Sequence, residues 1–237
     1  MADLKDIPVR RIDWGDAFRL IPSRFPPVEL YEPIAPKEEW EALKRIETLT
    51  NPRVREKGGA GLLLPEDRSV DQNWLVAPFA YPDPEPSHFS DGSYGVCVLA
   101  QSRHSALLLS IRRREEFLRR TGEGPTRLVM RVIKMPIKTK LHDLTQCVEM
   151  NDKITAREKV RQLRQAKSYG FLLVGPKGGK DRLGVILRPT AFNPPAVQAE
   201  HYCFIWNGER IHQIFAFKEG EVIDPNDLMQ SSSRSAA

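Results

Sequence analysis

The chain has 237 residues, of which 41% are hydrophobic and 28% charged, a composition typical of a folded globular protein rather than a disordered one. The net charge is +5, but the 36 basic residues are interleaved with 31 acidic ones, and the densest basic run, at 112–114, is followed by two glutamates. We interpret this run as the solvated face of a helix, which argues against a nucleic-acid-binding stripe. No apolar stretch is long enough to span a membrane, no signal-peptide core is present and the three cysteines are far apart, so we expect a cytoplasmic protein.

The first half of the chain is punctuated by prolines and short apolar runs. Residues 20–36 contain five prolines, which predicts an extended surface segment. Further along, the patterns predict a helix over 36–48, a short strand over 62–64 between two loops, a strand over 74–81 and a buried strand over 94–100. Ser102 is then a candidate N-cap for a helix that runs to about Arg120 and is stopped by Gly122.

The second half alternates strands with one more helix. Thr155 and Glu158 form a capping-box pattern, which predicts a basic amphipathic helix that ends at Gly170. Asn207-Gly208 is a strong hairpin signal. Strands are predicted over 126–135, 171–174 and 183–188, and over the two arms of the hairpin, 202–206 and 210–217. About eight short strands and three main helices in uneven order predict an α+β fold.

Two motifs that suggest chemistry have simpler explanations. The loop GPKGGKD resembles a phosphate loop, but Lys180 is followed by Asp181, where that loop needs Ser or Thr, so we interpret it as a hairpin turn. Among the five histidines and three cysteines, His201 and Cys203 alone share one face of a strand. Two ligands do not make a tetrahedral site, so no metal site is predicted.

Residues 87–121, SHFSDGSYGVCVLAQSRHSALLLSIRRREEFLRRT, place a polar turn before a buried strand and a helix, an arrangement that can build a ligand cleft. This segment resembles the RES domain, whose usual form reads S-R-F-S-D-G-S-Y-G-V and then A-I-A-E-T. The likeness covers most of residues 18–217, so we expect 1–17 to be an N-terminal extension and 218–237 a C-terminal tail that is disordered at its end. The resemblance implies a compact ADP-ribosyltransferase-like fold with twisted, short-stranded sheets. It also implies that NAD⁺ is bound and either degraded or used to transfer ADP-ribose, by a toxin that pairs with a helix-turn-helix antitoxin.

The positions at which the resemblance places the family's working residues are substituted in this chain. They hold His88 for arginine, Val98 for tyrosine (or Cys97, if the register shifts by one), Leu109 for glutamate and Gly175 for serine. An imidazole cannot present the planar fork that arginine offers to a pyrophosphate. A leucine cannot stabilise the positive charge that develops as nicotinamide leaves. The sequence therefore predicts a catalytically impaired protein, a pseudoenzyme.

Three functions follow from this pattern. The first is an impaired RES-like protein that acts by binding a nucleotide or a protein, such as an antitoxin, an active RES homologue or a second copy of itself. The second is a divergent active enzyme with NAD as substrate, and a carboxylate beside Leu109 and His88 would favour it. The third is a nucleic-acid-associated protein that uses the basic helices over 103–120 and 156–168. The candidate ligand-binding residues are Arg19, Arg24, His88, Phe89, Ser90, Asp91 and Tyr94.

Overall fold

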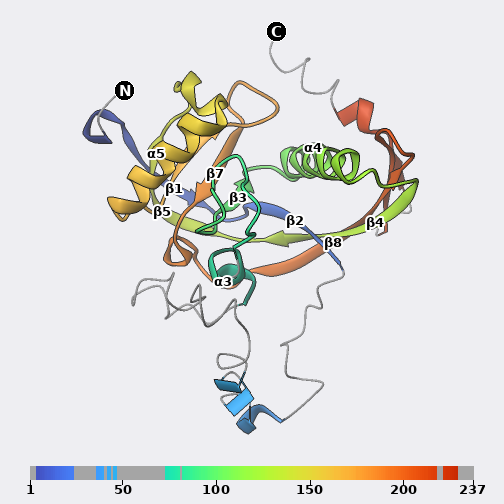
Figure 1. Ribbon diagram of the computed structural model, residues 1–237, viewed down its shortest axis with the longest axis horizontal. Coiled ribbons are helices and arrows are strands. Elements are labelled where there is room, and N and C mark those ends of the chain that lie inside the picture. Colours follow the sequence, from blue (N-terminus) through green and yellow to red (C-terminus); the bar gives the residue numbers. More distant parts are fainter. Residues whose placement is uncertain are drawn as a thin grey trace.

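One ten-stranded sheet forms the centre of the fold. The computed structural model describes residues 4–23, 36–39, 42–43, 45–46, 73–80, 82–217 and 221–228. The strand order is β1-β5-β6-β7-β3-β2-β4-β8-β9-β10, with β5 and β6 parallel and the other neighbours antiparallel. Helices and strands are not in regular alternation along the chain, and the predicted α+β class is confirmed (Figure 1).

The described residues contain ten strands and three main helices. The strands are β1 (Val9–Trp14), β2 (Phe18–Pro22), β3 (Cys97–Ala100), β4 (Thr126–Lys134), β5 (Ile137–Asp143), β6 (Gly170–Val174), β7 (Arg182–Ile186), β8 (Val197–Trp206), β9 (Ile211–Ala216) and β10 (Glu221–Ile223). The helices are α3 (Asn73–Ala80), α4 (Arg103–Thr121) and α5 (Lys153–Gln165), with short 3-10 turns η1 (Leu4–Asp6), η2 (Lys37–Glu39), η4 (Val148–Asn151) and η5 (Pro189–Ala191). Because β1 and β10 belong to the sheet, the sheet extends beyond residues 18–217 at both ends.

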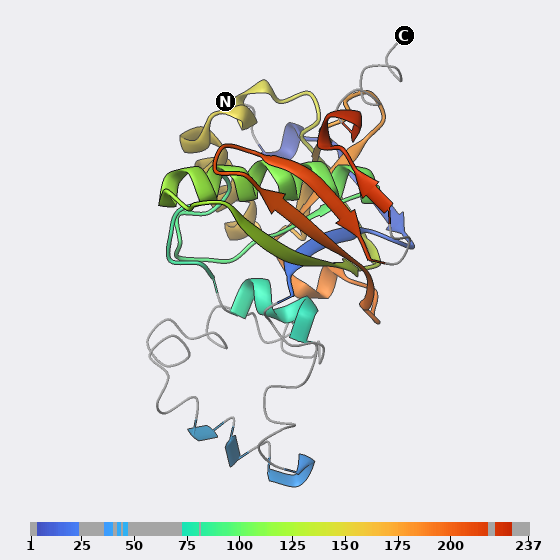
Figure 2. The same ribbon diagram turned by 90° about the vertical axis from the view of Figure 1, so that its right-hand side faces the viewer.

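The helices lie on both faces of the sheet, as Figures 1 and 2 show. On one face, α4 packs Leu107 into a core with Phe204, and α5 packs Leu163 against Phe171. On the other face, α3 buries Leu75 in a separate core. Full burial of each such side chain contributes ~1.5–3 kcal/mol, so the apolar stripes of the helices hold the layers together.

Helix α4 begins and ends where the sequence predicts. Ser102 is its N-cap and accepts a hydrogen bond from the backbone N–H of Ser105 at 3.2 Å. Gly122 ends the helix in the left-handed region at φ 64°, a conformation that glycine adopts without steric cost. The strands predicted around β4, β6 and β7 and the hairpin of β8 and β9 are also confirmed.

The strand expected over residues 74–81 is wrong, because this segment forms α3. Its sequence, NWLVAPFA, is apolar at nearly every position, so periodicity cannot distinguish a buried strand from a buried helix. Leu75 and Phe79, four residues apart, are 0% and 3% exposed and face the sheet together. Packing on the sheet therefore selects the helix. Tyr81 lies outside the described residues.

Helix α5 also differs from the prediction at both ends. Its N-cap is Asp152, whose carboxylate accepts a hydrogen bond from the backbone N–H of Thr155 at 2.8 Å. The helix therefore begins one turn before the Thr155–Glu158 pattern, and it ends at Gln165, with Gly170 already in β6.

Several expectations fall partly or wholly on residues that the structure does not describe. These are the strand over 62–64 and its flanking loops, Arg24, most of the proline-rich segment 20–36 and the greater part of the helix over 36–48.

The sheet opens between β2 and β3. Among the described residues, these strands pair at a single position, Phe18 with Ala100, whereas β2 pairs with β4 along its whole length. The two strands diverge from the next residue onward, and that residue is Arg19.

Candidate functional site

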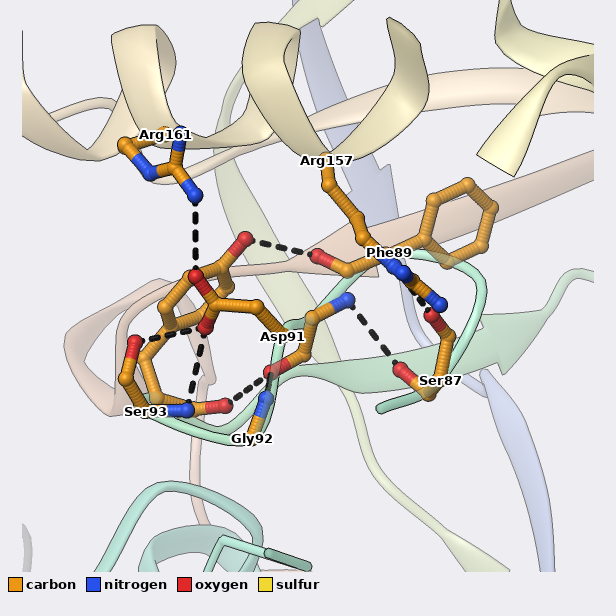
Figure 3. A network of polar contacts seen from close by, with 9 residues as sticks. Ser87, Phe89, Asp91, Gly92, Ser93, Arg157 and Arg161 are labelled. Carbon is orange, nitrogen blue, oxygen red and sulfur yellow. Dashed lines mark hydrogen bonds and ion pairs between the residues drawn. The ribbon is translucent and has the colours of Figure 1, made fainter. Parts of the chain in front are cut away.

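The polar turn before β3 is held together by its own hydrogen bonds. The Ser90 hydroxyl is buried, donates to the backbone oxygen of Tyr94 and accepts from the N–H of Gly92 at 3.1 Å. The Tyr94 hydroxyl donates to the backbone oxygen of Phe89 at 2.9 Å. Asp91 accepts from both the hydroxyl and the N–H of Ser93, at 2.6 Å and 3.0 Å (Figure 3). The polar groups that the sequence offers to a ligand are therefore used to shape the turn.

Two arginines of α5 bind this turn from above, as Figure 3 shows. Arg157 donates to the backbone oxygen of Ser87 at 2.8 Å, and Arg161 forms an ion pair with Asp91 at 2.9 Å. The hydrogen bond from Ser93, followed by that from Arg161, lowers the pKa of Asp91 to about 2. Asp91 is thus a fixed carboxylate whose charge is already paired.

His88 and Phe89 also face α5 and its neighbours. His88 Nε2 lies 2.8 Å from the backbone oxygen of Met150, and since a carbonyl oxygen accepts only, Nε2 carries the proton. The Phe89 ring meets the rings of His88 and Phe171 edge-on, at 4.6 Å and 5.6 Å between centroids. The position at which the resemblance places arginine therefore joins the turn to η4, which precedes α5.

Val98 and Leu109, the other two substituted positions that carry a side chain, are apolar residues in apolar surroundings. Val98 is half-buried against the core that contains Phe171 and Val185. Leu109 is half-buried against Ala100 and Leu183 beneath α4. Both side chains pack among apolar residues, and Leu109 itself supplies no negative charge where the resemblance puts a glutamate.

The substitution at Gly175 makes room for a carboxylate from elsewhere in the chain. A Cβ atom built on Gly175 would overlap the side chain of Asp181, whose Oδ2 occupies that space. Oδ2 accepts from the Ser105 hydroxyl at 2.7 Å and from the N–H of Lys177 at 3.2 Å. Ser105 lies one turn before Leu109 on α4, so a fixed carboxylate lies near two of the four substituted positions.

Arg19 contacts β3 at the point where β2 leaves it. Arg19 donates from NH1 to the thiol of Cys97 at 3.3 Å, and burial raises the pKa of that thiol, so it is not a reactive thiolate. The pKa of Arg113 on α4 is lowered, first by loss of solvent and then by the charge of Arg19, although the residue itself is exposed. The pKa of Arg114 is lowered by loss of solvent and by the charges of Arg113 and Arg19.

The structure thus separates the predicted ligand-binding residues into two groups. His88, Phe89, Ser90, Asp91 and Tyr94 form the turn bound to α5, whereas Arg19 lies on β2 and contacts Cys97 of β3. The run at 112–114 was interpreted as a solvated helix face. The exposed side chains of Arg112 and Arg113 and the Glu115–Arg119 pair at 3.0 Å fit that interpretation, whereas Arg114 is half-buried.

Asp181 and Ser105 were missed as site residues, because their contact joins segments 76 residues apart in the chain. Within the described residues, no group of three His, Cys, Asp or Glu side chains could hold a metal ion. A search of the same residues finds no helix with the length and apolar character needed to cross a bilayer.

The fold and these residues define an α+β protein whose single sheet opens between β2 and β3, beside Arg19. No family model matches the chain. Over 213 residues it is 35% identical to the uncharacterized protein y4oC of Sinorhizobium fredii (strain NBRC 101917 / NGR234), which covers 89% of this chain and 92% of that protein. The chain therefore belongs to the same family as y4oC.

A solved structure, the MbcT–MbcA toxin–antitoxin complex of M. tuberculosis, contains a similar chain with 12% sequence identity and a TM-score of 0.38, over 84% of this chain and 87% of that one. Similarity at this level is too weak to support a shared function.

Proposed function

We propose that this chain is a RES-like protein of the NAD-targeting toxin class whose cleavage of NAD⁺ is impaired, and that it acts by binding a nucleotide or a protein. The observation that carries the proposal is the surroundings of Leu109. Where the resemblance calls for a glutamate, a hydrocarbon side chain packs on Ala100 and Leu183. Loss of an anion that stabilises an oxocarbenium-like centre removes a major electrostatic contribution to catalysis.

The nearby carboxylates of the described chain are already engaged. Glu115, six residues along α4, accepts from the backbone N–H of Ile211 at 2.7 Å and pairs with Arg119. Glu116 lies seven residues from Leu109, ~10 Å along the helix axis, and pairs with Lys153 at 3.5 Å. Neither glutamate is placed to take over the role of a carboxylate at position 109.

The test is NAD⁺ loss on incubation with the purified protein, with nicotinamide release measured in parallel. We expect no turnover above a buffer control and unchanged cellular NAD⁺ at high expression. NAD⁺ turnover by the wild-type protein that is lost on substitution of Asp181 or Arg19 would contradict the proposal. Turnover by a contaminating enzyme would not respond to either substitution.

A divergent active enzyme is the second candidate, and Asp181 is the observation that favours it. Its carboxylate fills the space beside Gly175 and is oriented by Ser105, one turn before Leu109. If the chain is an active enzyme, Asp181→Asn should abolish nicotinamide release, because it keeps the shape of the side chain and removes its charge. Glu116→Gln, on the same side of α4 as Leu109, should leave nicotinamide release unchanged. Equal activity of wild type and Asp181→Asn would exclude Asp181 as the replacement acid.

The sequence features suggest a cytoplasmic protein, and the impaired RES-like function suggests a protein partner, either a helix-turn-helix antitoxin, an active RES homologue or a second copy. Light scattering distinguishes these partners, because it gives the mass of the purified protein by itself and of its complex with a co-expressed candidate. Direct nucleic-acid binding is the least favoured function, because Arg157 and Arg161 of α5 are bound to the polar turn and Arg164 lies over the Tyr94 ring at 4.4 Å. Strongly salt-dependent binding to DNA or RNA would reverse that order.

A further inference from the structure

Strand β1 lies at one end of the ten-stranded sheet, on the side away from β8 (Figure 1). One edge of β1 pairs with β5 along all six residues from Val9 to Trp14. Among the strands of the described chain, none pairs with the other edge. An edge strand presents a row of backbone groups that can pair with a further strand, so β1 offers about 20 Å of sheet edge to a partner.

The pairing with β5 fixes which backbone groups of β1 point outward. The N–H of Asp143 donates to the backbone oxygen of Pro8 at 2.7 Å, so the carbonyl group of Pro8 points toward β5. Backbone groups alternate in direction along a strand, and those of Val9, Arg11 and Asp13 therefore point away from β5. Within the part of the chain that the structure describes, no hydrogen bond engages these outward groups.

The side chains of β1 complement a second copy of the same strand. An antiparallel pair of β1 strands about a two-fold axis at Ile12 sets the two Ile12 side chains opposite each other. Arg11 then stands opposite Asp13 of the second copy, and both have outward backbone groups that can exchange hydrogen bonds. One residue further out, Arg10 stands opposite the ring of Trp14 of the second copy. Opposite charges and cation–π contacts at directly opposed positions stabilise such a pair.

The direction of the backbone groups and the charges together select this register. A two-fold axis between two residues would set an outward backbone group against an inward one, so the axis must pass through a residue. An axis through Arg11 or Asp13 would set like charges opposite each other, which is unfavourable. At Ile12 the axis avoids this repulsion, and it joins two side chains that are buried in the core on one face of the sheet.

Arg11 has a like charge, and no carboxylate, as its neighbour on β5. Its directly opposed residue is Lys140, and both side chains are exposed. Asp13, in contrast, stands opposite Lys138 and pairs with it at 3.1 Å. Among the described residues Arg11 forms no ion pair. Asp13 of a second copy would therefore offset a repulsion that the single chain retains.

We propose that the outer edge of β1 pairs with the same edge of a second copy of this chain, about a two-fold axis at Ile12. The proposal rests on the proposed function only for the expectation of a protein partner, and it names that partner. A two-fold pairing uses the β1 edge of each copy once, so assembly through this edge ends at a dimer. One pair of six-residue strands is smaller than a standard interface, so we expect a reversible dimer whose population rises with concentration.

The experiment is sedimentation velocity of the full chain over a concentration series, where we expect the mass to rise from one chain to two. Arg11→Asp and Asp13→Arg should each weaken association by at least about tenfold, because symmetry places the like charges at two positions. The double variant Arg11→Asp/Asp13→Arg exchanges the charges and should return to within about threefold of wild type. Arg210→Asp is the matched control, since it reverses an exposed charge in the hairpin of β8 and β9, and its association should stay within about twofold.

A second measurement tests the backbone pairing. Arg11→Pro removes an N–H that points away from β5, and proline is tolerated at such positions of an edge strand. At a concentration where wild type is monomeric, the variant should melt close to the wild-type temperature. Its association should nevertheless weaken by at least about tenfold, because both copies lose a hydrogen bond at the axis.

A wild-type chain that stays monomeric at its highest soluble concentration would overturn the interface. A dimer that is insensitive to Arg11→Asp and Asp13→Arg, or a double variant no better than the single ones, would do the same. These outcomes are independent of NAD⁺ turnover. Turnover by a charge-sensitive dimer would overturn the impaired-enzyme proposal and keep the interface, whereas a monomer without turnover would overturn the interface alone.

Discussion

Gly175 is the position at which one added methyl group should have the largest effect. Its backbone is not in the left-handed region, so alanine can adopt the same conformation. The effect of the substitution on stability is therefore decided by the space around the new methyl group. The new Cβ would overlap the Asp181 carboxylate. Gly175→Ala should therefore expel that carboxylate from its position between Ser105 and Lys177.

The expected cost follows from the bonds that are lost. A hydrogen bond to a charged group contributes ~1.5–3 kcal/mol, and Asp181 accepts one from the Ser105 hydroxyl at 2.7 Å and one from the N–H of Lys177 at 3.2 Å. The second bond is longer, and alanine restricts the unfolded chain in a way that stabilises the fold by ~0.4–1 kcal/mol. The free energy of unfolding should fall by ~2–3 kcal/mol, which lowers the melting temperature by about 4–12 °C for a chain of this size.

The assay is urea unfolding of Gly175→Ala, Asp181→Ala and the double variant. In the double variant the added methyl group has no carboxylate to displace, so Gly175→Ala should cost nothing beyond Asp181→Ala. Gly124→Ala is the control, since Gly124 has open space around its Cβ position and should change stability by no more than ~0.5 kcal/mol. Additive effects of the two substitutions would refute the reasoning, because they would mean that the methyl group and the carboxylate do not meet.

Three further predictions concern the scaffold. The pKa of Asp91 is lowered from 3.8 to about 2, so its contribution to stability is complete above about pH 4 and is lost as the pH falls towards 2. Asp91→Asn should lower the free energy of unfolding by ~1 kcal/mol at pH 7, which is less than the pKa difference alone implies, because solvent screens the half-exposed Arg161. The variant should also lose less stability than wild type as the pH falls from about 4 to about 2. An equal loss in both proteins would count against the ion pair. Ser102→Ala removes the N-cap of α4 and should cost ~1 kcal/mol in chemical unfolding, whereas Ser102→Asp should be neutral. Leu163 is fully buried on the side of α5 that faces the sheet, so Leu163→Ala should lower the free energy of unfolding by ~2–5 kcal/mol in the same assay. A loss below ~1 kcal/mol would mean that α5 is not packed on β6 as described.

What the sequence by itself determined are the elements whose ends depend on neighbouring residues. Ser102 and Gly122 delimit α4 because a capping hydroxyl and a left-handed glycine act within one turn. The Asn207-Gly208 turn sets the hairpin of β8 and β9 for the same reason, with Gly208 at φ 101°. The α+β class follows from the order of such elements.

The tertiary structure alone decided which residues meet across long stretches of chain. The segment of α3 is apolar throughout, and packing of Leu75 on the sheet selected the helix. Arg19 reaches Cys97 across 78 residues, and Ser105 reaches Asp181 across 76. No local propensity encodes such contacts, because they form only when the strands pair and a helix packs on them. The Arg19–Cys97 contact and the carboxylate beside Gly175 both arise in that step.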